Sequence, residues 1–195
     1  AKNKLTEAVL FLVKAILDLL SVGVLITFFF RLFRVDYYNP IVQGMTKITD
    51  LFTSSLRRLF KSPFGIDFAS LVIAFFLQAF CFFLISFSGY IAFKASTMLY
   101  WSLISVILLA LSVLWWALII GIITSWVSPT NPHPAVRLLQ QMTDQICKPF
   151  RVFLPAMGGL DFSPILAFLI LNFIYRAVVS MSSDAGLPIK LSIGM

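Results

Sequence analysis

Residues 151–164 read RVFLPAMGGLDFSP, and a related stretch, RRLFKSPFGIDFAS, occupies residues 57–70. When the sequence is aligned with itself at an offset of 94 residues, both stretches fall within a longer match. This match runs without a gap from Pro40 to Leu71, which we call the first copy. Eight of these 32 positions are identical, whereas chance at ordinary composition gives about two. The identical pairs include Asp50/Asp144, Arg57/Arg151, Gly65/Gly159 and Asp67/Asp161. The chain therefore contains an internal duplication.

Long apolar runs flank both copies. The chain has 195 residues, of which 60% are hydrophobic and 12% are charged, whereas a soluble domain is about one quarter charged. With a mean hydropathy of +0.98, this composition excludes a cytosolic enzyme, a disordered chain and a disulfide scaffold. A membrane helix needs about 20 mainly apolar residues. Four runs meet this length, at about residues 6–30, 68–93, 97–126 and 162–180.

Each copy carries an amphipathic segment between its two apolar runs, at about residues 41–60 and 135–154. In the first segment, apolar residues recur at steps of three and four, at Ile41, Met45, Ile48, Phe52, Leu56 and Leu59. The second segment repeats this pattern at Val136, Leu139, Met142, Ile146, Phe150 and Phe153. Basic residues on the other faces are typical of a helix in the plane of the bilayer interface. A helix docked on the protein's own spans explains the pattern equally well, and both arrangements can hold together.

The order of these elements predicts an all-α membrane protein. Its four transmembrane helices form two parallel repeats, residues 1–94 and 95–195, each with an amphipathic interfacial helix between its two spans. Two spans per repeat return the chain to its starting side, so a pseudo-twofold axis along the membrane normal relates the copies. No small-residue cleavage site follows the first apolar run, which predicts a retained span.

The stretch from Pro149 to Pro164 resembles the signature of the YggT (YlmG) family of small bacterial and plastid membrane proteins, and residues 36–70 resemble that family's other repeat. The sequence departs from the family pattern at Leu51, Ser55, residues 61–64, Gln145 and Val152. The resemblance implies a multi-pass protein of the bacterial inner (plasma) membrane, loosely linked to osmotic stress, division or envelope processes, and in plastid relatives to cytochrome assembly. It implies no catalytic residues. Because the first copy carries the altered residues 61–64, we expect the second copy to be the more constrained.

Asp67 and Asp161 each stand just before an apolar run, where a carboxylate caps the free amides of the first helical turn. Arg57 and Arg151 stand ten residues upstream of them. We expect each arginine to pair with its aspartate and to fasten the interfacial helix to the next span. Pro164 fits the first turn of a helix, where its missing N–H has no helical partner. An ion or lipid-headgroup site at these residues is the alternative.

Gly158 and Gly159 lie where the chain turns from the second interfacial helix into the last span, and glycine there permits positive φ and close backbone approach. A phosphate-cradling loop is the weaker alternative, because no P-loop or dinucleotide fingerprint occurs. Both glycines are therefore assigned a structural role.

Lys14 and Asp18 are four residues apart inside the first span. They predict an ion pair within one helix, and a polar groove or a subunit contact is the alternative. We expect Gln78 and Asn172 to make hydrogen bonds between helices. We expect Arg176 to reach the interface near the end of its span.

The basic residues are unevenly divided between the two sides of the predicted bundle. The two connections with amphipathic segments hold nine Lys and Arg residues, and the opposite side holds four, or five with Arg176. The positive-inside rule then places both amphipathic helices in the cytoplasm and both termini outside.

No set of nucleophile, base and acid is recognisable in the sequence. The single histidine, His133, excludes a bis-histidine haem site within this chain, and Cys81 and Cys147 have no metal or redox spacing. We therefore expect no enzyme activity, no cofactor and no metal. The net charge of +7 predicts anionic lipid headgroups as partners, beside partner proteins or a second copy. No nucleic acid is expected, because Arg57 and Arg58 lie on a helix with an apolar face. The expected function is a membrane scaffold or assembly factor, with an oligomeric transporter or channel as the alternative.

Overall fold

The computed structural model describes residues 4–59, 65–89, 91–154, 161–184 and 186–187. Its elements within these ranges are α1 (Lys4–Leu32), α2 (Pro40–Leu59), α3 (Phe68–Phe87), α4 (Ala95–Val127), α5 (Pro134–Cys147), the 3₁₀ helix η2 (Phe150–Val152) and α6 (Ser163–Asp184). By length and composition, α1, α3, α4 and α6 are able to cross a membrane. The predicted all-α, multi-pass membrane fold is confirmed.

Two helix boundaries differ from the sequence-based prediction, each for a local reason. α3 ends at Phe87 rather than near residue 93, because Gly89 adopts a φ of +76° that terminates the helix. The second interfacial segment is one continuous helix only from Pro134 to Cys147. It resumes as η2 after Pro149, since proline has no N–H to donate to the preceding turn.

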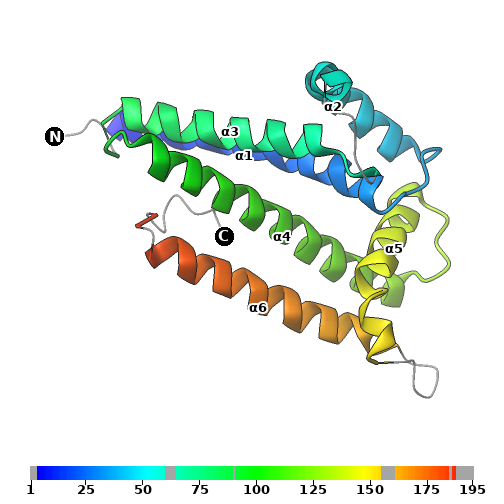
Figure 1. Ribbon diagram of the computed structural model, residues 1–195. Coiled ribbons are helices and arrows are strands. Elements are labelled where there is room, and N and C mark those ends of the chain that lie inside the picture. Colours follow the sequence, from blue (N-terminus) through cyan, green and yellow to red (C-terminus); the bar gives the residue numbers. More distant parts are fainter. Residues whose placement is uncertain (1–3, 60–64, 90, 155–160, 185, 188–195) are drawn as a thin grey trace.

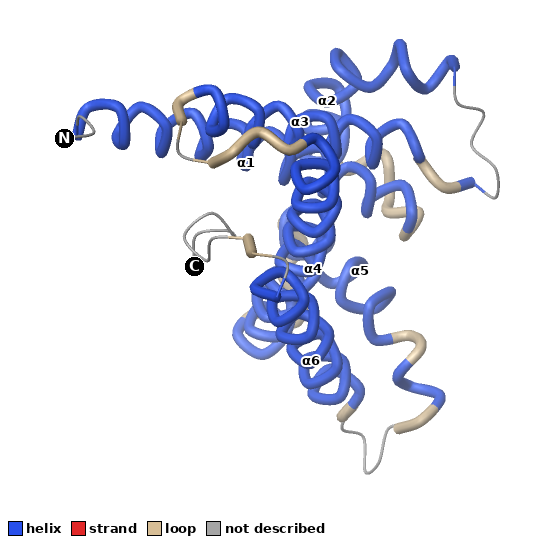
Figure 2. Tube along the Cα trace, turned by 60° about the vertical axis from the view of Figure 1, so that its left-hand side comes forward, coloured by secondary structure: helices blue, strands red, loops and turns tan. Residues whose placement is uncertain are grey.

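α4 is the central helix of the bundle. α1 and α3 pack against each other and against α4, and α6 packs on α4. Figure 1 shows the four long helices side by side, with α2 and α5 at the same end of the bundle. In Figure 2, α6 again forms the lower edge of the bundle, across α4 from α1 and α3. Two repeats of the same orientation must have their amphipathic helices at the same end of the bundle, and this is the arrangement observed.

α5 docks on the bundle through its apolar stripe, with Leu138, Met142 and Ile146 buried. Its approach to α4 is close, because a Cβ added at Gly121 would lie 1.9 Å from Thr143 Oγ1. This contact requires glycine at that position. Of the two arrangements left open by the periodicity, α5 adopts the docked one.

α2 docks through a largely polar stripe instead. Its buried residues are Val42, Thr46, Thr49 and Thr53. Three members of its apolar stripe, Ile41, Met45 and Leu56, pack against the core. The outward part of the stripe has exposed fractions of 61% for Ile48, 77% for Leu51, 56% for Phe52 and 79% for Leu59. The two amphipathic helices are therefore alike in sequence pattern and different in what their apolar faces contact.

Candidate functional site

The first repeat gathers two arginines and two aspartates at the end of the bundle that carries α2. Arg31 comes from the end of α1, Asp50 and Arg57 from α2, and Asp67 from the residue before α3. Arg31 pairs with Asp67, and its Nη2 lies 2.7 Å from Asp50 Oδ1. Arg57 Nη1 lies 3.1 Å from Asp50 Oδ1, and Arg57 Nη2 lies 3.4 Å from Asp67 Oδ2. These four residues, here called the first cluster, connect three helices.

Asp67 is the most buried member of the first cluster, with 5% of its side chain exposed. It caps α3 as predicted, accepting hydrogen bonds from Ser70 N at 3.4 Å and from Ser70 Oγ at 2.7 Å. Burial opposes ionisation of Asp67, but the hydrogen bonds from Ser70 and Arg31 and the charges of Arg31 and Arg57 outweigh it and lower its pKa. Burial likewise opposes ionisation of Asp50, and Arg31 and Arg57 lower its pKa. Both aspartates are thus anions at neutral pH, matched by two guanidinium groups.

The second repeat forms a smaller version of this arrangement, here called the second cluster, from Arg151, Asp144 and Asp161. Arg151 Nη2 lies 2.8 Å from Asp144 Oδ1, and Arg151 Nε lies 2.9 Å from Asp161 Oδ2. Asp161 Oδ1 accepts from Ser163 N at 2.9 Å. Burial opposes ionisation of Asp161, but hydrogen bonds from Ser163 and Arg151 outweigh it and lower its pKa. The predicted pairing of each arginine with the aspartate ten residues later is confirmed in both copies.

The expected order of the two copies is wrong, because the first copy is the more constrained. Asp67 is nearly inaccessible, whereas 33% of the Asp161 side chain and 43% of the Arg151 side chain are exposed. The first cluster also has an additional member, Arg31, where the aligned position of the second copy holds Ser125. Arg31 is one of the nine basic residues counted above in the two connections. Its lack of an equivalent in the second copy is the signal that distinguishes it.

The other site residues predicted near the two clusters are compared with the structure one by one. Arg57 and Arg151 contact aspartates of their own repeat, as expected. Arg58 is exposed on α2 and has no ion pair within the described part of the chain. Pro164 lies in the first turn of α6, as expected. The predicted turn at residues 158–159 lies outside the described residues.

Lys14 and Asp18 form the predicted ion pair inside α1, with 13% and 20% of their side chains exposed. Gln78 of α3 donates from Nε2 to Asp18 Oδ1 at 3.1 Å and to Ser21 Oγ at 3.0 Å. The interhelical hydrogen bond predicted for Gln78 is therefore present. This polar joint links α1 and α3, and its groups are satisfied by one another.

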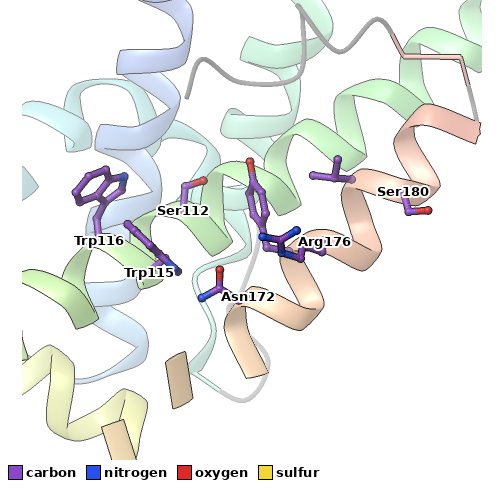
Figure 3. Close-up of a pocket in the computed structure, with 8 residues that line it drawn as sticks. Ser112, Trp115, Trp116, Asn172, Arg176 and Ser180 are labelled. Atoms are coloured by element: carbon purple, nitrogen blue, oxygen red, sulfur yellow. The ribbon is translucent and has the colours of Figure 1, made fainter. Parts of the chain in front are cut away.

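A cavity of about 450 Å³ lies between α4 and α6. Figure 3 shows Ser112, Trp115 and Trp116 of α4 and Asn172, Arg176 and Ser180 of α6 around it. The prediction for Asn172 is wrong, because its Nδ2 donates to the carbonyl oxygen of Phe168 within α6, at 2.9 Å. Arg176 lines the cavity, which no sequence pattern indicated.

The described ranges hold no group of three or more His, Cys, Asp or Glu side chains placed to bind a metal ion. The carboxylates of both clusters face guanidinium groups of the same chain. What the clusters do chemically is hold helices in a fixed relation. In the first repeat, that relation keeps the threonine side of α2 on the bundle and its apolar side outward.

Comparison with known proteins identifies relatives of this sequence. The CCB3/YggT family model matches residues 6–88 and 100–182, one segment for each repeat. An uncharacterized protein of Pseudomonas aeruginosa is 38% identical over 192 residues, covering 97% of this chain and 98% of its own length. The YggT protein of Escherichia coli K12 is 31% identical over 180 residues, 90% of this chain and 92% of its own. YlmG homolog protein 2 of the Arabidopsis thaliana chloroplast is 44% identical over 74 residues, 38% of this chain and 27% of its own. No solved structure matches the chain.

Proposed function

The chain belongs to the CCB3/YggT family, and we propose that it works as a non-enzymatic scaffold or assembly factor in the bacterial plasma membrane. In this proposal α2 lies in the bilayer interface and gathers anionic lipid headgroups, and the spans hold partner proteins or a second copy. The amphipathic helices lie on the cytoplasmic side and the termini outside, in accord with the distribution of Lys and Arg. A link to osmotic stress, division or envelope processes belongs to the same proposal.

The outward apolar stripe of α2 carries this proposal. Leu51 and Leu59 are more than three quarters exposed, at 77% and 79%. A contiguous apolar face on a helix beside four membrane spans fits insertion at the boundary of headgroups and acyl chains. The first cluster holds the opposite face of the helix against the bundle, so the stripe has one fixed direction.

Two exposed cations of α2 suit anionic headgroups. Lys47 and Arg58 are exposed and have no ion pair among the described residues. Each basic residue close to an anionic membrane surface contributes about 1 kcal/mol of binding. The pair therefore favours anionic over zwitterionic lipid at α2 by about 2 kcal/mol, or roughly thirtyfold.

A fluorophore on Ser55→Cys tests the proposal at α2 itself. Ser55 is exposed and lies one helical turn from Leu51 and Leu59, while both native cysteines are buried. In reconstituted vesicles, brominated phosphatidylglycerol should quench the label more strongly than brominated phosphatidylcholine. The double variant Lys47→Glu, Arg58→Glu should abolish the difference.

The matched control reverses two exposed charges, one on α5 and one at its C-cap, where the apolar stripe is docked. Arg137→Glu with Lys148→Glu changes the net charge equally and should leave the preference at residue 55 intact. Quenching by neither lipid would show that α2 is outside the bilayer and would overturn the proposal. If both double variants lost the preference for phosphatidylglycerol equally, the preference would be due to the net charge of the protein rather than to α2.

A transporter or channel subunit is the second candidate, favoured by the polar joint of Lys14, Asp18 and Gln78 inside the spans. Four spans rarely enclose a pathway alone, so this function requires an oligomer. Proteoliposome flux that disappears in the double variant Lys14→Met, Asp18→Leu would support it. Absence of flux for every ion tested would exclude it.

A further inference from the structure

Arg176 is a cation in the second half of α6, within four residues of the end of the apolar run predicted at about 162–180. It lies thirteen residues after Ser163 and eight before Asp184. At 1.5 Å per residue, these separations place it about 20 Å from one end of the helix and about 12 Å from the other. Charges within a membrane span are unfavourable and usually face protein, water or a ligand that neutralises them.

The protein supplies Arg176 with no counter-ion in the described ranges. No ion pair or hydrogen bond joins it to another described residue, and its side chain is exposed. On the facing helix, Ser112 Oγ is buried without a hydrogen-bond partner. Both groups line the same cavity, and Figure 3 shows them on opposite sides of it. A guanidinium and an orphaned hydroxyl at one cavity indicate a ligand that accepts hydrogen bonds and carries negative charge.

We propose that the cavity between α4 and α6 binds an acidic lipid, with its phosphate or carboxylate on Arg176 and Ser112. This site is separate from α2, because Arg176 is nearer the Asp184 end of α6, whereas α2 and α5 lie at the opposite end of the bundle (Figure 1). The rings of Trp115 and Trp116 supply the apolar wall beside the headgroup.

The surface next to the cavity accommodates the acyl chain. Phe173 and Leu169 stand three and seven residues before Arg176 on α6, so all three lie along one side of the helix. Phe173 is 74% exposed and Leu169 is 58% exposed. A lipid whose acidic group contacts Arg176 therefore extends its chain along these residues, toward the centre of the bilayer.

Cavity size favours a lipid headgroup over a helix of a partner protein. A volume of about 450 Å³ lies in the range of small-ligand sites, about 300 to 1,000 Å³. A second copy with a carboxylate at this depth is the competing occupant, and the experiment separates the two.

Tryptophan quenching reports on this cavity through Trp116, which also lines a second cavity beside α1 and α5, so the substitutions at Arg176 are needed to assign the signal. In a Trp126→Phe background, which removes a distant indole that is 81% exposed, brominated phosphatidylglycerol and brominated phosphatidylcholine are compared in reconstituted vesicles. Trp116 is half exposed at the cavity. Anionic lipid should quench it selectively and saturably. A third arm with bromostearate distinguishes a carboxylate from a phosphate as the acidic group.

Substitutions then assign the selectivity to the proposed groups. Arg176→Gln should weaken binding of the anionic lipid about tenfold or more, because it removes a charge-assisted hydrogen bond. Arg176→Lys should retain the selectivity, which controls for folding. Ser112→Ala, a small change on the other helix, should weaken binding about fivefold.

Three results would overturn the proposal. The first is equal quenching by the anionic and zwitterionic lipids and by bromostearate in the parent protein. The second is a dimer in detergent that Arg176→Gln dissociates, together with unselective quenching, which would assign the cavity to a second copy. The third is lipid selectivity that Arg176→Gln leaves unchanged.

Discussion

Replacing Asp67 with asparagine should release α2 from the bundle, whereas the same change at Asp161 should leave α5 docked. Asparagine keeps the shape of the side chain and removes the charge. α2 depends on that charge because its docked face is rich in threonine, and the first cluster supplies its ionic contacts. α5 is held in addition by a buried apolar stripe.

The burial of each cluster sets the magnitude of the two effects. Removing one partner of a buried ion pair costs about 3–5 kcal/mol. Asp67 is 5% exposed, while Arg31 and Arg57 are 26% and 28% exposed, so we take the lower value, about 3 kcal/mol. Asp161 and Arg151 are 33% and 43% exposed, and a pair of this kind contributes at most about 1 kcal/mol.

Amide hydrogen exchange in detergent micelles measures both losses. The amide exchange rate of residues 40–59 should increase about a hundredfold in Asp67→Asn. The exchange rate of residues 134–147 should increase about fivefold in Asp161→Asn. Arg58→Gln, which changes an unpaired arginine of α2, is the control and should leave exchange unchanged. Equal acceleration in the two variants, or a larger effect on α5, would refute the claim that the first cluster holds α2.

The first cluster, the contact between α4 and α5 and the exposed face of α2 each have a measurable consequence. The folded protein lowers the pKa values of Asp50 and Asp67 below the value of an unfolded aspartate, which is about 3.9. The stability that these two carboxylates contribute is therefore present above the unfolded pKa, and it is lost as the pH falls through the folded pKa values. Thermal unfolding should therefore be insensitive to both groups from pH 7 to 5 and should shift downward below about pH 4. Gly121→Ala should destabilise the protein by about 1–3 kcal/mol, because the new Cβ would lie 1.9 Å from Thr143 Oγ1; Thr143→Ala should restore part of the loss, and an unchanged melting temperature for Gly121→Ala would contradict the close contact. Leu51→Glu should reduce lipid quenching at residue 55 several-fold without changing the melting temperature, since Leu51 is 77% exposed.

Local patterns in the sequence were sufficient for much of the fold. Apolar length predicted the four spans, and the fixed offset of 94 residues predicted that α2 and α5 lie at one end. The pairing of Arg57 with Asp67 was also predictable, because both residues recur at equal spacing in the second copy. The ion pair of Lys14 and Asp18 follows from helical geometry alone. In each case the interacting residues are close in sequence or related by the repeat.

Other features depend on contacts between segments that are distant in sequence. Helical periodicity shows that α2 and α5 are amphipathic, but it cannot show which face packs on the bundle, because both a polar and an apolar face can dock. The threonines of α2 are buried since Arg31, at the end of another helix, pairs with Asp50 and turns that face inward. For the same reason, the altered residues 61–64 did not indicate that the first copy is the more constrained, because its burial depends on Arg31.

The sequence by itself therefore established the number of spans, the duplication and the ion pair between arginine and aspartate in each repeat. These follow from the length of the apolar runs, the repeat offset and the spacing of the charged residues. The three-dimensional packing alone placed Arg31 in the first cluster, turned the apolar stripe of α2 outward and set Arg176 beside Ser112. Each of these depends on how helices separated by dozens of residues are rotated about their own axes. That rotation is fixed by the packing of the whole bundle, which no local stretch of sequence encodes.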